Sequence, residues 1–179
     1  MKRILLVGLL LLGACGDERE AAAPPPAEMT AEAVGHYCNM ALAEHAGPKG
    51  QIFVAGKDRP VWFSSARDTI AFTMLPDEPK DLRGIYVTDM GKAESWENPG
   101  NAAWTDARAA FYVIGSKQRG GMGQMEAVPF AERARAEAFA KENGGQVMAF
   151  ADIPRDYILG TDTPAVATHG SGHGSGHKP

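Results

Sequence analysis

The sequence contains few cysteines, no cluster of basic residues and no apolar run long enough to cross a membrane as a helix. Only two of its 179 residues are Cys, which excludes a disulfide scaffold and a four-cysteine zinc site. The 18 Lys and Arg are outnumbered by 22 Asp and Glu and gather only within the first three residues, so a nucleic-acid-binding face is not expected. Nucleotide-binding glycine loops, serine-hydrolase elbows and zinc-protease motifs are also missing from the sequence.

The N-terminus has the pattern of a secreted lipoprotein. Lys2 and Arg3 precede the apolar residues 4–12, and small residues lead to Cys15, which together predict a signal peptide over residues 1–14. Residues 12–15 (Leu-Gly-Ala-Cys) resemble a bacterial lipobox, in which Cys15 is acylated and becomes the first mature residue. We therefore expect a lipid-anchored protein on the periplasmic face of a membrane. Gly16, in place of the Asp associated with inner-membrane retention, favours the outer membrane; the alternative is an ordinary signal peptide with an incidental Cys.

Composition divides the rest of the chain into a tether, a folded domain and a tail. Residues 17–27 contain no aromatic or β-branched residue and include three consecutive prolines, so residues 15–28 are predicted to form a tether. The last 19 residues, 161–179, are rich in Gly, Ser, His, Pro and Thr and are predicted to be a flexible tail. The folded domain is therefore expected to span residues 29–160.

Within this domain, the apolar pattern predicts alternating strands and helices. Two strands at 51–55 and 60–63 are joined by a turn and followed by a helix that Ser64 or Ser65 caps and that ends near residue 75. Further strands are expected at 84–88, 109–114 and 146–150, and a second helix at 130–142, whose predicted apolar face is Phe130, Ala134, Ala138 and Phe139. The segment 61–63 (Val-Trp-Phe) is echoed by 128–130 (Val-Pro-Phe). We therefore predict an α+β fold made of two related strand-strand-helix halves.

Sulfur and imidazole groups gather in a few short segments. Residues 36–40 (His-Tyr-Cys-Asn-Met) include Cys38 and Met40, and His45 follows; Met90 lies at the end of a predicted strand, and glycines flank Met122 on both sides. A thiolate combined with thioethers favours Cu(I), whereas a core Met normally lies inside a periodic apolar element. Other interpretations remain open: Cys38 as a small buried residue, Met90 and Met125 as core residues, and the histidines as hydrogen-bonding groups.

The tail contains a second group of metal-binding side chains. His169, His173 and His177 are spaced by four residues among Gly and Ser. Such histidines can bind borderline ions such as Cu(II), Ni(II) or Zn(II) with modest affinity. They are a candidate secondary metal site; the alternative is a solvated low-complexity end.

Several of these motifs, in this order, resemble the NosL family of lipoprotein accessory factors of nitrous-oxide reductase in denitrifying bacteria. The resemblance runs from the lipobox to about residue 157, and it rests on the segments 36–40, 47–51 (Gly-Pro-Lys-Gly-Gln), 87–90 (Val-Thr-Asp-Met), 121–123 (Gly-Met-Gly), 128–130 and 144–145 (Gly-Gly). The family commonly has Gly at the position of Asn39, and Asn tolerates similar backbone angles. The His-rich tail lies outside the shared pattern.

The resemblance implies a copper chaperone without catalytic activity and a fold similar to part of the organomercurial lyase fold. It implies that one Cu(I) is bound and supplied to the copper centres of the nitrous-oxide reductase apoprotein, chiefly the tetranuclear copper-sulfide site. An export or assembly complex of the inner membrane is implied as a second partner. Cys38 and Met122 are the first ligand candidates, Met40 is the next, and Met90 or His45 completes the set.

Two other functions are weighed against this one. A thiol-based lyase acting on an organometal would need a pair of thiols and an acid, but outside the lipobox the sequence offers Cys38 alone. In the other alternative, Cys and Met are structural and the tail buffers metal. This alternative predicts that deletion from Thr168 onward abolishes copper binding, whereas Cys38→Ala leaves it intact.

Overall fold

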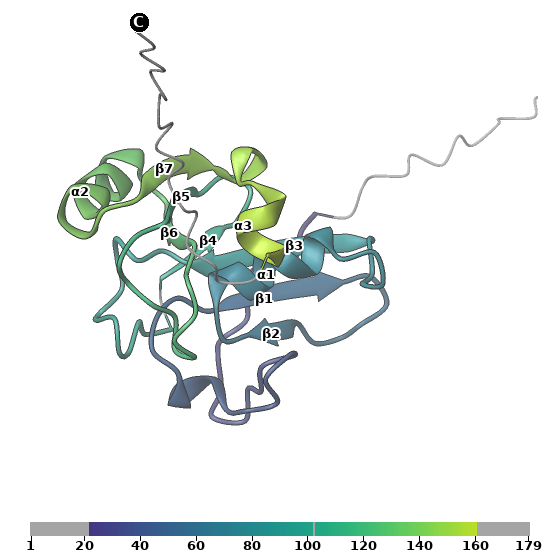
Figure 1. Ribbon diagram of the computed structural model, residues 1–179. Helices are drawn as coiled ribbons and strands as arrows, with labels where there is room; N and C mark the ends of the chain where they lie inside the picture. Colours follow the sequence, from purple (N-terminus) through teal and green to yellow (C-terminus); the bar gives the residue numbers. More distant parts are fainter. Residues whose placement is uncertain (1–21, 102, 161–179) are drawn as a thin grey trace, which may run out of the picture.

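The structure, a computed structural model, describes residues 22–101 and 103–160, which form two antiparallel sheets with helices packed against them (Figure 1). The first sheet has the order β2-β1-β3-β4, with β1 at Gly50–Val54, β2 at Val61–Phe63, β3 at Leu82–Thr88 and β4 at Trp104–Asp106. The second has the order β6-β5-β7, with β5 at Phe111–Ile114, β6 at Val128–Phe130 and β7 at Gln146–Ala149. The helices are α1 (Ala66–Met74), α2 (Arg133–Asn143) and α3 (Arg155–Leu159), with two 3-10 turns, η1 (Leu42–Glu44) and η2 (Phe150–Asp152).

The two halves share one topology, strand-strand-helix-strand with the first strand in the centre. In the first half Gly50 pairs with both Phe63 and Val87; in the second half Phe111 pairs with both Phe130 and Ala149. Each helix begins three residues after the Phe that ends its preceding strand. The predicted α+β fold with two related halves is therefore confirmed.

Three details of the predicted elements need correction. The second helix begins at Arg133 instead of residue 130, because Phe130 is still paired in β6. Its inward side is Ala136, Phe139 and Ala140, while Ala134 and Ala138, which were predicted to face inward, are exposed. Strands β4 and β6 and helix α3 were not predicted as elements; all three are short, and none has enough residues to establish an apolar period.

The second sheet lies between two apolar clusters and joins the halves into one core. Tyr112 and Ile114 on β5 face the main cluster, which includes Ile52, Phe72 and other residues of the first sheet and α1. Val113 points the other way, into a smaller cluster with residues of β6 and α2. This alternation is the period of two expected along a strand.

Side-chain hydrogen bonds hold the N-terminal part of the described chain on the first sheet. The Tyr86 hydroxyl donates to the Pro24 carbonyl at 2.6 Å, and the amide side chain of Gln51 both accepts from Ala27 N (2.7 Å) and donates to Ala27 O (3.0 Å). The C-terminal end of the expected tether over 15–28 therefore lies against the domain.

Several predictions fall on parts of the chain that the structure does not describe. Three predictions lie outside the described residues: the signal peptide, the lipidation of Cys15, and the tail with His169, His173 and His177. None of the helices in the described part is both long enough and apolar enough to cross a bilayer.

Candidate metal centre

Cys38 lies in a tight hairpin turn just before the first sheet. Gly35 N donates to Met40 O at 3.0 Å and Asn39 N donates to Gly35 O at 2.8 Å, which closes the turn. Asn39 has a φ of 54°, the left-handed conformation that Asn tolerates better than most residues. A Cβ atom at position 35 would lie 2.5 Å from Cys38 Sγ, so the thiol occupies the space that glycine leaves open.

An imidazole and a hydroxyl surround the Cys38 thiol. His45 Nε2 lies 4.0 Å from Cys38 Sγ, and the thiol donates to Ser64 Oγ at 3.6 Å. His45 follows η1 and is buried, while Cys38 is partly exposed. A metal bonded at about 2.3 Å to the sulfur and about 2.0 Å to the nitrogen would bridge the two atoms at an angle of roughly 140°. The pair is therefore spaced to share one ion.

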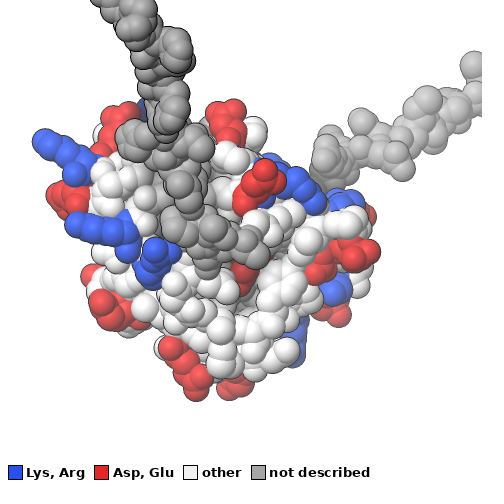
Figure 2. Space-filling view, viewed as in Figure 1, with Lys and Arg blue, Asp and Glu red and all other residues white. Residues whose placement is uncertain are grey.

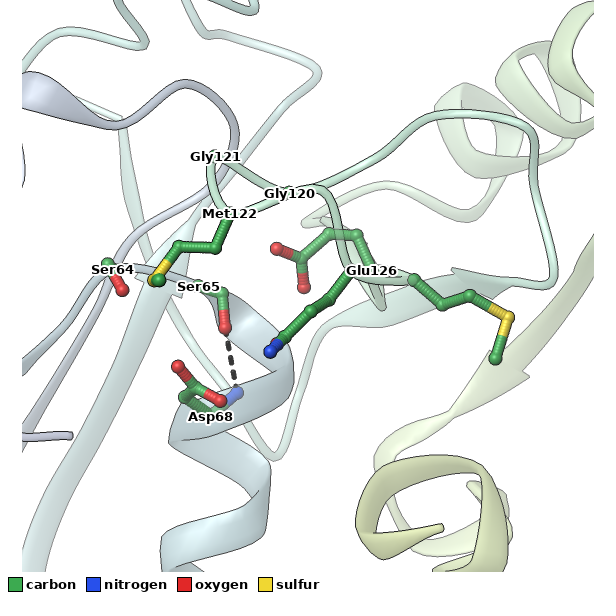
Figure 3. A pocket seen from close by; sticks show the side chains of 9 residues that line it. Ser64, Ser65, Asp68, Gly120, Gly121, Met122 and Glu126 are labelled. Atoms are coloured by element: carbon green, nitrogen blue, oxygen red, sulfur yellow. Dashed lines mark hydrogen bonds between the residues drawn. The ribbon is translucent and has the colours of Figure 1, made fainter. Parts of the chain in front are cut away.

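Met122 reaches the same place from the second half of the molecule. A Cβ atom at Gly121 would lie 2.6 Å from His45 Cβ and 2.9 Å from Ala46 N, so the glycine loop packs directly against the His45 segment. The side chain of Met122 is 51% exposed, and Figure 3 shows its sulfur beside Ser64, with which it lines one pocket. Because Ser64 also contacts the Cys38 thiol, the thioether and the thiol converge on one serine.

Below this loop lies Glu126, a carboxyl group that is completely buried. Its Oε1 accepts from Arg67 N (2.8 Å) and Ala127 N (2.9 Å), which ties the loop to the first turn of α1. Among the described residues its Oε2 has no hydrogen-bond partner, and it faces Gly120, where a Cβ atom would be 3.0 Å away. Burial is the main reason that the pKa of Glu126 is raised to about 8.

Lys49 is a buried basic side chain next to the His45 segment. Its Nζ donates to Ala46 O at 3.2 Å and to Gly47 O at 2.6 Å. Burial lowers the pKa of Lys49 to about 8. The two carbonyls that Lys49 holds directly follow His45, so this side chain fixes the backbone against which the Met122 loop packs.

The remaining sulfur candidates occupy different surroundings. The side chain of Met40 is 37% exposed, and its carbonyl lies 4.0 Å from Cys38 Sγ. Met90 packs against the apolar cluster of the second half, beside α2 and β6. Met74 and Met148 pack against the main core, as expected. The structure thus places Cys38 and His45 side by side and packs the loop of Met122 against the His45 segment.

Acidic and imidazole side chains do not form a metal site on their own. In the described segments, no group of three or more His, Cys, Asp or Glu is placed to hold an ion. A metal bound at Cys38 and His45 would therefore draw any further side-chain ligand from the methionines.

Sequence reasoning missed the residues that support the site. Ser64 was expected only as a candidate helix cap, and Glu126 and Lys49 resemble solvent-exposed charges in the sequence. The proximity of Lys49 to two glycines and a proline was a signal of a tight turn. No local pattern distinguishes Glu126, because its burial depends on contacts with α1, which lies far away in the sequence.

Comparisons with known proteins agree on one family. The family model described as NosL matches residues 26–158. The chain is 47% identical over 157 residues to the copper-binding lipoprotein NosL of Achromobacter cycloclastes, covering 87% of this chain and 81% of that protein. It is 32% identical over 173 residues to the copper-binding lipoprotein NosL of Stutzerimonas stutzeri, covering 94% and 87%. The crystal structure of the copper chaperone NosL from Shewanella denitrificans superposes with a TM-score of 0.68 at 30% identity, covering 74% of this chain and 98% of that one.

Proposed function

Because this chain belongs to the NosL family, we propose that it is a copper chaperone, not an enzyme, which binds one Cu(I) through Cys38, His45 and Met122. The observation that carries the proposal is the convergence of these three side chains: the thiol lies 4.0 Å from the imidazole, and the Met122 loop packs on His45. Met40 is the next candidate ligand, since it belongs to the same turn as Cys38 and is exposed. We leave Met90 out of this set because it already has apolar partners.

The chemistry of the three groups suits Cu(I). A thiolate and a thioether are soft ligands, and imidazole also binds copper. The thioether carries no proton, so only the thiol and a protonated imidazole have to lose protons before the ion binds.

The position of the site suits delivery. Met122 is half exposed and Cys38 is partly exposed, so an incoming ligand can reach the ion before the donor ligands leave. Three protein ligands also leave Cu(I) with a free coordination position. Transfer by ligand exchange needs no change in oxidation state, and the thiolate can be reprotonated once the ion has left.

The recipient is the nitrous-oxide reductase apoprotein, chiefly its tetranuclear copper-sulfide site, with an inner-membrane export or assembly complex as the second partner. Support for this comes from the family alone. The lipobox-like residues 12–15 support a chain anchored by a lipid at Cys15 on the periplasmic face, with the outer membrane favoured.

Competition with a Cu(I) chelator tests the ligand set. Cys38→Ala should weaken the Cu(I) affinity by about two or more orders of magnitude, and Met122→Ala by about one, because each removes a sulfur ligand. Met74→Ala is the matched control: it also removes a thioether, but one that packs against the core, so affinity should not change. Unchanged affinity in both Cys38→Ala and Met122→Ala would overturn the site.

The same assay separates this function from metal buffering by the tail. A chain that lacks residues 168–179 should retain its high-affinity Cu(I) site, since Cys38, His45 and Met122 remain. If this deletion abolished Cu(I) binding while Cys38→Ala retained it, the tail would be the binding element instead.

A further inference from the structure

The exposed large apolar side chains of the described chain are gathered at one place. They are Val34, Tyr37, Met40 and Met122. The first three belong to the hairpin of Cys38, and the fourth belongs to the loop that packs against His45. A cluster of this kind on an otherwise polar surface marks an interaction site more often than scattered apolar residues do.

Tyr37 is the most firmly held member of this cluster. Its hydroxyl donates to Glu78 Oε1 at 3.0 Å, and its ring lies 5.8 Å from that of Phe63 and 4.8 Å from that of His36. A tyrosine that is fixed before binding loses little conformational entropy in a complex, which is why rigid aromatic residues serve as anchors in interfaces.

Acidic residues border this apolar surface. Residues 30–46 contain Glu32 and Glu44 but no Lys or Arg, and residues 120–125 contain no charged residue. Asp68 lines the pocket beside Met122, and Glu78 holds Tyr37. In Figure 2 the lower part of the molecule is white and red, whereas the blue groups lie mainly over α2 and on the right-hand side. Exposed basic residues come near this surface in the sequence at two places, Arg119 directly before residues 120–125 and Lys80 two residues after Glu78.

We propose that Val34, Tyr37, Met40 and Met122, with Glu32, Glu44 and Glu78 at the border, form a docking surface for a copper-accepting protein whose own contact surface is apolar in the centre and basic at the edge. The inference rests on the proposed function, because it places the surface around the copper site. Docking there would bring the acceptor's ligands to Cys38 and exclude water from the exchange. The acidic border would increase the association rate of a basic partner.

Charge argues against the two other occupants of such a surface. An anionic lipid headgroup would be repelled by the acidic border. A second copy of this chain would place the same acidic groups opposite one another, because a two-fold interface joins identical surfaces.

Charge reversal on the border tests the proposal. The double variant Glu32→Lys/Glu44→Lys is compared with Glu142→Lys/Asp152→Lys, which makes the same change in net charge at exposed residues of α2 and η2. Each variant is expressed as the only copy of this protein in cells grown with limiting copper. The readouts are the copper content of the purified nitrous-oxide reductase and the Cu(I) affinity of each purified variant.

The border variant should lower the copper content of the reductase by about fivefold or more while its Cu(I) affinity stays within about twofold of the parent, because rim charges act mainly on association rates. The control variant should match the parent. Val34→Ser, which leaves every proposed ligand in place, should also lower the copper content of the reductase.

Equal copper content in the border and control variants would overturn the docking surface. So would a dimer of the purified parent that Val34→Ser dissociates, or binding of the parent to phosphatidylglycerol vesicles that Val34→Ser abolishes. Cys38→Ala serves as the reference: if it left the copper content unchanged, the delivery function itself would fail.

Discussion

At the scale of single residues, two glycines determine how closely the site residues approach one another. Gly35 leaves room for the Cys38 thiol, and Gly121 lets the Met122 loop lie against His45 and Ala46. Even one methyl group at either position would overlap existing atoms, and such overpacking typically costs 1–3 kcal/mol. The site geometry therefore depends on residues that cannot themselves bind a metal.

Gly121→Ala should weaken Cu(I) binding without preventing folding. The added methyl group would push the loop away from His45 and move the thioether of Met122 out of reach, so we expect a loss of about tenfold or more in affinity, or roughly 1.4 kcal/mol. The measurement is chelator competition, with unfolding in urea as a check on stability.

Gly123→Ala is the control for this substitution. Gly123 has a φ of 78°, which strains any other residue, but its added Cβ would meet open space. Both variants should be destabilised, and only Gly121→Ala should lose affinity. A similar loss in both would mean that general strain in the loop, instead of contact with His45, controls binding.

The buried carboxyl group of Glu126 should make the stability of the fold depend on pH in an unusual way. Its pKa is raised from 4.5 to about 8 in the folded chain, so the folded state keeps a proton that the unfolded state releases above pH 4.5. This contribution to stability is complete below pH 4.5 and is lost as the pH rises towards 8, with a slope of at most about 1.4 kcal/mol per unit. The pKa of Lys49 is lowered from 10.5 to about 8, so this group destabilises the fold at a constant level below pH 8 and makes stability rise with pH only between about pH 8 and 10.5.

Glu126→Gln should remove this slope, because the amide cannot release a proton. Urea unfolding between pH 5 and pH 8 measures it: the parent should lose stability over this range more steeply than the variant. Parallel pH profiles for the two proteins would contradict the buried, protonated state of Glu126.

At the scale of secondary-structure elements, the repeat supplies its own internal control for helix capping. Ser65 caps α1, with its hydroxyl accepting from Asp68 N at 2.9 Å. The equivalent residue of α2 is Glu132, which makes no side-chain cap hydrogen bond. Ser65→Ala should therefore cost about 1 kcal/mol in unfolding free energy, and Glu132→Ala should cost close to nothing. Equal losses would show that the hydroxyl of Ser65 is not what stabilises α1.

The sequence predicted the elements well where local signals were strong. Most of the predicted elements lie within a few residues of their expected ranges: the β1–β2 hairpin, α1 with its serine cap, β3, β5 and β7. The start of α2 was misplaced because Phe130 fits a helical period and a strand end equally well. Only its pairing with Phe111 decides between them, and pairing partners cannot be read from local sequence.

The same limit applies to the site. The sequence singled out the thiol and the glycine-flanked methionine, because their types and neighbours are unusual, and the resemblance to the NosL family added His45 to the candidate ligands. It could not choose between Met90 and His45 as further ligands. Our proposal of His45 over Met90 rests on the contact of Gly121 with His45 and on the packing of Met90 against α2 and β6, and these contacts join residues that lie far apart in the sequence.

At the scale of the whole molecule, the proposed copper site is shared between the halves. Cys38 and His45 precede the first sheet, and Met122 belongs to the loop between β5 and β6 of the second sheet. An ion bound to all three would bind the folded chain more tightly than the unfolded one and would therefore stabilise it. The tail histidines, which are predicted as a secondary metal site, are the candidate competing ligands in the same chain.

X-ray absorption on the full chain loaded with one Cu(I) tests the central claim most directly, because it distinguishes sulfur from nitrogen neighbours of the ion. The account predicts a nearest shell dominated by sulfur, which loses one sulfur in Met122→Ala and keeps its composition in His169→Gln/His173→Gln/His177→Gln. A nearest shell of nitrogen alone, altered by the tail substitutions and unaffected by Cys38→Ala, would contradict it.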